Sequence, residues 1–151
     1  MRMSRRIAIH NWGKRYLVLF DNTKGGDQTD ITGGWTGAGS GPTSTINIDT
    51  TITCIHKRND SEKNNVTIQT VNTFPFEKYS KLHVLSQRSP ASIYQRPTVN
   101  DTELPTSDTT METVIDISGI TDATRIVIKQ GGALNISSTL YTYIYKIWLE
   151  K

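Results

Sequence analysis

The hydrophobic pattern of the chain is a series of short apolar or alternating runs separated by polar turn signals. Each run is rich in β-branched and aromatic residues and has the length of a strand, which predicts β-strands and no helix longer than a turn or two. The runs cover residues 15–20, 44–56, 66–71, 81–87, 114–117, 124–129 and 139–149. The run 44–56 alternates strictly and is one half-buried strand or two strands with a bend near Asp49 and Thr50.

The last run, 139–149, is the most informative because it is both aromatic and long. Side chains alternate across a strand, so this run predicts two faces that both carry large apolar groups. One face would hold Tyr141, Tyr143, Tyr145, Ile147 and Leu149, and the other Leu140, Thr142, Ile144, Lys146 and Trp148. We therefore expect the strand to be covered on both sides, with Trp148 in the core.

Strands at this spacing, with no helix to cover a parallel sheet, predict an all-β antiparallel β-sandwich, and a jelly roll within that class. The length of 151 residues fits one domain, which we place at 7–151 behind a basic N-terminal arm at 1–6. Residues 88–110 form a polar insert with three prolines, too long for a hairpin turn, and loops of this length are often functional.

Composition narrows the classes of function. Threonine makes up about one residue in seven, which favours strands. The single cysteine, Cys54, excludes an internal disulfide and a cysteine metal site. No apolar run approaches the length of a membrane span, so no membrane association is expected. A net charge of +3 is too small to argue for nucleic acid, although the arm could touch it or an acidic neighbour; a solvated terminus explains the arm more simply.

Candidate chemistry is sparse. His10, His56 and His83 stand in no recognisable catalytic spacing, and a structural histidine is the usual case on a strand, so the chain is not expected to be an enzyme. No cofactor is expected. Ca²⁺ is a minor hypothesis, because Asp21, Asp27 and Asp30 lie in a Gly-rich stretch but lack the EF-hand spacing and the closing Glu. Turn and cap roles are the favoured interpretation of these acids.

Trp35 follows two glycines and has two interpretations. An exposed indole could stack on the apolar face of a sugar, as other apolar ligands stack on aromatic rings. Packing against one end of the sandwich is the favoured alternative, because large aromatic side chains are mostly buried.

Three short patterns resemble those of a domain found in bacteriophage and prophage virion proteins. They are Gly26-Asp27 followed by Thr32-Gly33-Gly34-Trp35, then Tyr79-Ser80-Lys81-Leu82, and finally Lys146-Ile147-Trp148-Leu149-Glu150. They occur in the same order as in that group and together span most of the chain. The resemblance implies a jelly-roll module, similar to carbohydrate-binding modules, in a tail, baseplate, fibre or capsid appendage.

From this resemblance we expect a virion structural subunit that binds other virion proteins and assembles with copies of itself. The expected assembly contacts are the arm and the insert, through Arg2, Arg5, Arg6, Tyr94 and Arg96. The alternative is a module that recognises a host-surface glycan, with Trp35, Tyr94, Asp27 and Asp30 as candidate contacts. Exposure separates the two hypotheses: a glycan site needs a coplanar pair of solvent-facing aromatics with nearby hydrogen-bonding groups, whereas an assembly surface is larger and flatter.

Overall fold

The computed structural model describes residues 15–26, 28–58, 64–90, 96–131 and 136–151. Over these ranges the chain is almost entirely β, with one four-residue α-helix, α2 (Thr29–Thr32), and two short 3₁₀ turns, η1 (Asn22–Lys24) and η2 (Phe76–Lys78). The strands in the described ranges are β1 (Tyr16–Asp21), β2 (Trp35–Ala38), β3 (Ser44–Ile48), β4 (Ile52–His56), β5 (Val66–Thr70), β6 (Lys81–Ser89), β7 (Thr98–Val99), β8 (Thr102–Glu103), β9 (Met111–Asp116), β10 (Val127–Gln130) and β11 (Leu140–Glu150).

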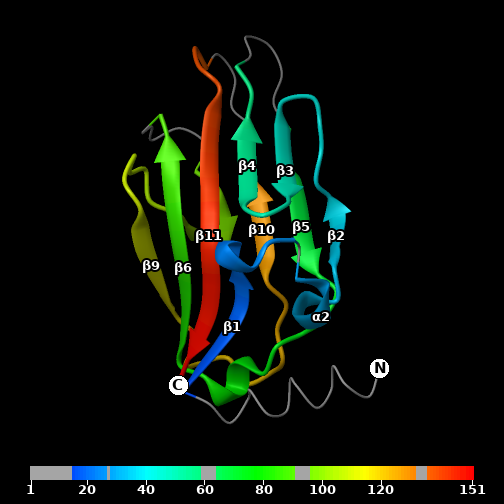
Figure 1. The fold of residues 1–151 in the computed structure, drawn as a ribbon, viewed down its shortest axis with the longest axis vertical. Coiled ribbons are helices and arrows are strands. Elements are labelled where there is room, and N and C mark those ends of the chain that lie inside the picture. The colour runs from blue at the N-terminus through cyan, green and yellow to red at the C-terminus, as the bar shows by residue number, and fades with distance from the viewer. Residues whose placement is uncertain (1–14, 27, 59–63, 91–95, 132–135) are drawn as a thin grey trace.

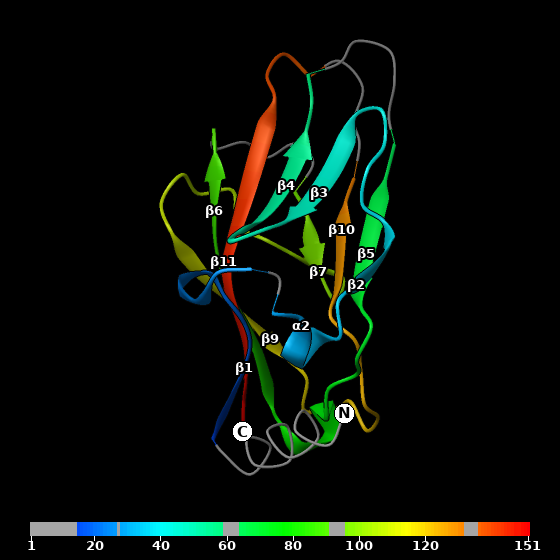
Figure 2. The same cartoon turned by 45° about the vertical axis from the view of Figure 1, so that its right-hand side comes forward.

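These strands form two antiparallel sheets packed face to face, which confirms the predicted β-sandwich of the jelly-roll class (Figures 1 and 2). Sheet A has the order β3-β4-β11-β6-β9, and β1 also pairs with β11. Sheet B has the order β2-β5-β10-β7-β8. The core lies between them and is built from alternating inward side chains such as Ile52, Ile128 and Ile144, all fully buried.

Strand β11 is the centre of sheet A. Along one side it pairs with β4 through residues 140–144 and with β1 through residues 146–150, while β6 follows it along the other side. Because three strands are hydrogen-bonded to this one, its side-chain directions decide what sheet A shows to solvent.

The prediction that β11 alternates regularly and is covered on both faces is wrong. Its pairing with β6 shifts register between Ile144 and Lys146, which is a β-bulge at Tyr145. The extra residue reverses the alternation beyond it, so Ile147 and Leu149 point into the core instead of sharing a face with the tyrosines. Trp148, expected in the core, is only partly buried and lies on the outer face.

Two other predictions are refined. The run 44–56 is two strands, β3 and β4, which form a hairpin with its turn at 49–51. The polar insert 88–110 is not a plain loop, because it begins with the end of β6 and contains the short strands β7 and β8 of sheet B. Within the described residues, no helix is long or apolar enough to cross a membrane.

Candidate functional site on the outer face of sheet A

A row of three tyrosines runs along the N-terminal half of β11 on the outer face of sheet A. The rings of Tyr141 and Tyr143 are 6.3 Å apart between centroids with an angle of 5° between their planes. Tyr143 and Tyr145 follow at 6.4 Å and 16°. Residues two apart on a strand project from the same face at about this spacing, so the strand itself sets the repeat. We call these three side chains the tyrosine row.

The tyrosine row is open to solvent at one end and partly sheltered at the other. Tyr141 is 37% exposed, while Tyr143 and Tyr145 are half-buried. The Tyr145 hydroxyl donates a hydrogen bond to the Gln87 side-chain oxygen at 3.1 Å. Burial raises the pKa of Tyr145, and the neighbouring Tyr143 raises it further, so this phenol keeps its proton at neutral pH and remains a hydrogen-bond donor.

Three polar, uncharged side chains and one isoleucine flank the first two rings of the tyrosine row. In the sheet register Tyr143 lies between Thr53 of β4 and Gln87 of β6. Tyr141 lies between Ile55 of β4 and Ser89 of β6 in the same way. Directly opposed side chains share a face of the sheet, so hydroxyl and amide groups stand beside the rings.

Beside the C-terminal half of β11, the outer face carries a second aromatic group, in which Trp148 stacks on His83. Their ring centroids are 4.8 Å apart and their planes differ by 9°. The Lys146 ammonium lies 5.3 Å from the centre of the same indole, within cation–π range. With both neighbours against it, the Trp148 ring is held in place by the sheet surface and is less accessible than the ring of Tyr141.

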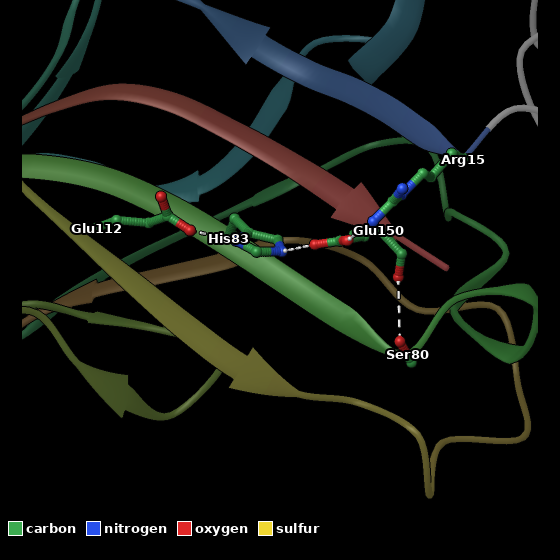
Figure 3. Close-up of polar contacts among 5 residues, drawn as sticks. All are labelled: Arg15, Ser80, His83, Glu112 and Glu150. Atoms are coloured by element: carbon green, nitrogen blue, oxygen red, sulfur yellow. Dashed lines mark hydrogen bonds and ion pairs between the residues drawn. The ribbon is translucent and has the colours of Figure 1, made fainter.

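Two carboxylates hold the His83 imidazole, one at each ring nitrogen, as Figure 3 shows. Nδ1 is 2.5 Å from Glu112 Oε1 and Nε2 is 2.8 Å from Glu150 Oε2. The His83 side chain is only 8% exposed. An imidazolium can donate to both carboxylates, whereas a neutral imidazole donates to only one. The cluster therefore ties β9, β6 and β11 together through side chains as well as through the ladder.

Glu150 also accepts a hydrogen bond from Arg15 at 3.2 Å, on the side away from His83. Partial burial of the carboxyl would raise its pKa, but the hydrogen bonds from Arg15 and His83 outweigh this and hold the pKa of Glu150 below its ordinary value. The residue is thus a carboxylate at neutral pH, and with His83 it serves sheet pairing rather than ligand contact.

Of the site residues predicted from sequence, the three that the structure describes lie away from the outer face of sheet A. Trp35 is partly buried at the start of β2 and packs against the core, with its indole Nε1 sealed from solvent. Asp30 is exposed in the first turn of α2. Arg96 lies in the part of the chain belonging to sheet B, where it pairs with Glu103 at 2.5 Å. The other predicted contacts lie outside the described residues: Tyr94, Asp27, Arg2, Arg5 and Arg6.

The structure assigns local roles to the remaining candidates. Asp21 caps η1, accepting hydrogen bonds from the Thr23 amide at 3.0 Å and hydroxyl at 2.7 Å, which is the turn role favoured from sequence. His56 is fully buried, with its Nδ1 3.1 Å from the Ser44 hydroxyl. Among the described residues, no group of three or more His, Cys, Asp or Glu side chains is arranged to hold a metal ion.

Sheet B offers a different kind of surface. A polar hollow lies over β5, β7 and β10, lined by Asn65, Thr67, Arg96, Thr98, Asp101, Lys129, Gln130 and Gly131. Two cations of this hollow are already paired, Arg96 with Glu103 and Lys129 with Asp101 at 2.7 Å. None of the described residues lining it is aromatic. Parallel exposed aromatics are thus a property of sheet A.

The comparisons with known proteins found matches among solved structures. No family model matches the chain, and no curated protein matches it. Among solved structures, CBM29-1, a family 29 carbohydrate-binding module from Piromyces equi, aligns with a TM-score of 0.49 and 14% identity over 89% of this chain and 88% of that one. A second structure, described as a family 29 carbohydrate-binding module, aligns at a TM-score of 0.47 and 11% identity, over 89% and 86% of the two chains. At this distance the similarity leaves the site to be argued from the residues of this chain.

Proposed function

We propose that the protein is a glycan-binding module that holds its ligand on the tyrosine row of sheet A. The observation that carries the proposal is the parallel arrangement of Tyr141, Tyr143 and Tyr145 on one open sheet face. A sugar ring has an apolar face that packs on an aromatic ring and a polar rim that needs hydrogen-bonding partners. The row supplies the first, and its flanking side chains supply the second.

The orientation of a ligand follows from the geometry of the strand. The three rings follow one another along β11, so an extended oligosaccharide would lie along the strand axis with successive sugars over successive tyrosines. Thr53 and Gln87 flank Tyr143, the middle ring, and stand where hydroxyl groups of such a chain would lie. Binding of this kind involves no covalent step and no metal.

The test is a binding titration against a panel of soluble polysaccharides, by affinity electrophoresis first and calorimetry second. Loss of one stacked aromatic side chain removes roughly 1.5–3 kcal/mol of contact, so Tyr143→Ala should weaken binding roughly ten- to a hundredfold. Tyr16→Ala is the matched control, because Tyr16 is 46% exposed on β1 but lies outside the row.

Two results would overturn this assignment. Equal losses in Tyr143→Ala and Tyr16→Ala would show that the row is not the site. Loss of binding in Trp35→Ala, with stability unchanged and Tyr143→Ala unaffected, would move the site to β2 and restore the alternative weighed from sequence.

The virion subunit expected from the three short motifs stays a prediction. In the described structure the second and third motifs lie side by side, because Lys81 pairs with Glu150 and Leu82 pairs with Leu149, whereas residues 32–35 of the first motif lie at α2 and β2. A host-surface glycan as ligand would be compatible with a virion appendage. Mass spectrometry of purified particles from the source organism would test that location directly.

A further inference from the structure

Strand β9 is an edge strand of sheet A. It pairs with β6 along Met111–Asp116, and no described segment pairs with its other side; Figure 1 shows it at the left margin of the molecule. The opposite edge, β3, is covered, because Gly41 N–H donates to Ser44 O at 2.8 Å and Ile46 N–H donates to Gly39 O at 2.6 Å. An uncovered edge of this length is a template for another strand.

The backbone groups that face outward from β9 follow from the register. Ile117 N–H donates to Ser80 O of the β6 side at 2.9 Å, and the β6–β9 pairing shows no register shift. Backbone groups alternate in direction along a strand, so Thr113 and Ile115 also face β6. Glu112, Val114 and Asp116 therefore present their N–H and C=O groups to the free side.

Two large apolar side chains of this edge are exposed in a single copy of the chain. Met111 is 45% exposed and Val114 is 52% exposed, two of the most exposed large apolar side chains on the described surface. Exposed apolar side chains on an unpaired six-residue edge point to a missing neighbour.

We propose that β9 pairs antiparallel with β9 of a second copy of this chain, in the register that sets Thr113 opposite the partner's Thr113. Directly opposed residues of two antiparallel strands lie on the same face of the sheet. A symmetric pairing of two β9 strands is therefore possible only where one residue lies opposite the same residue of the partner. Centring on Glu112 opposes it to the partner's Glu112, and centring on Val114 opposes Glu112 to the partner's Asp116. The register centred on Thr113 takes these carboxylates out of direct opposition and leaves them as diagonal neighbours, and no other register gives a longer overlap.

In this register one apolar pair forms twice, because Met111 lies opposite the partner's Ile115. Glu112 lies opposite the partner's Val114. Thr113 falls at a pair without mutual backbone hydrogen bonds, where opposed side chains approach most closely. The contact is self-complementary and closes as a two-fold dimer.

The dimer would join the two copies of sheet A into one continuous sheet. If the proposed glycan site is correct, the two tyrosine rows would lie on the same face, antiparallel and about five strand spacings or roughly 24 Å apart. Such a dimer would bind a long polysaccharide at two points and gain avidity. The pairing itself does not depend on glycan binding.

The experiment is sedimentation velocity of the full chain across a concentration series, on the wild type and three variants. We expect a concentration-dependent dimer for the wild type. Val114→Glu places a carboxylate opposite the partner's Glu112 twice per dimer and should raise the dimer dissociation constant about tenfold. Val114→Lys places an ammonium there and should leave the dimer intact or tighter. Val71→Glu, at a 47% exposed valine away from β9, should change nothing.

The outcomes separate the proposal from its alternatives. A wild type that is monomeric at every concentration overturns the pairing. Equal weakening by Val114→Glu and Val114→Lys overturns the register, and weakening by Val71→Glu points to another interface. Circular dichroism and thermal unfolding of each variant show that a lost dimer is not lost folding.

Discussion

Truncating neighbouring residues of β11 should produce an inverted order of costs, in which the larger side chain matters less. The β-bulge at Tyr145 turns Ile147 into the core and leaves Trp148 on the outer face. We therefore expect Ile147→Ala to destabilise the protein more than Trp148→Ala. A regular strand with Trp148 in the core would give the opposite order.

The magnitudes follow from the surroundings of each side chain. Ile147 is fully buried, and deleting a buried isoleucine to alanine costs about 2–5 kcal/mol through lost burial and the cavity left behind. Trp148 loses one ring stack with His83, worth about 0.5–1.5 kcal/mol, and one cation–π contact with Lys146, worth about 0.5–1 kcal/mol. These two contacts add about 1–2.5 kcal/mol to the apolar burial that the partly exposed ring also loses, and because no closed cavity is left, the cost of Trp148→Ala should stay below the roughly 3–5 kcal/mol of a buried tryptophan.

Urea unfolding followed by far-ultraviolet circular dichroism measures both free energies of unfolding, because that signal does not depend on the tryptophan that is removed. Trp148→Phe serves as the control, since it keeps an aromatic ring against His83 and should recover most of the loss. Native domains are stable by about 5–15 kcal/mol, so both variants should still fold. A cost for Trp148→Ala equal to or above that of Ile147→Ala would refute the assignment of Trp148 to the outer face.

Two further predictions follow from the titratable groups. The hydrogen bonds from Arg15 and His83 keep the pKa of Glu150 below the ordinary value of 4.5, so the stability from this carboxylate is fully present above about pH 4.5 and is lost as the pH falls through the lowered pKa. Melting temperatures measured from neutral pH down to about pH 3 should fall less steeply for Glu150→Gln than for the wild type, and parallel acid limbs would contradict this role. Complete burial raises the pKa of Cys54 to about 12, an effect that nearby Arg88 only partly offsets, so a thiol reagent at pH 8 should label it only after unfolding in urea. Labelling of the native protein at the rate of the unfolded chain would contradict that expectation.

The sequence predicted where the strands lie more reliably than it predicted which of their side chains point into the core. Alternation and turn residues located the strands of sheet A and strands β5 and β10 of sheet B, because such signals are local. It missed β7 and β8, two residues each, since a pair of residues carries no periodicity. Strand β2 was not predicted either, because it lies in a Gly-rich stretch where Trp35 and its neighbours offer little strand propensity.

The candidate site was likewise predictable from the sequence only in part. Tyr141, Tyr143 and Tyr145 stand at a two-residue spacing that is visible in the sequence, and this spacing alone places them on one face of a strand. Their exposure was not predictable, because whether a sheet face is covered depends on segments far away in the chain. The stacking of Trp148 on His83 likewise requires the pairing of β11 with β6, which brings residues 65 positions apart together.

The sequence by itself determined an antiparallel β-sandwich, a single buried thiol and an aromatic strand near its end, since composition and period 2 depend only on neighbouring residues. The tertiary structure alone decided that one extra residue at Tyr145 exchanges the inward and outward positions in the second half of β11. A bulge is defined by the strand that it pairs with, so no pattern within 140–150 reveals it. That single shift sends Ile147 and Leu149 into the core and leaves every aromatic side chain of β11 on the face where we place the function.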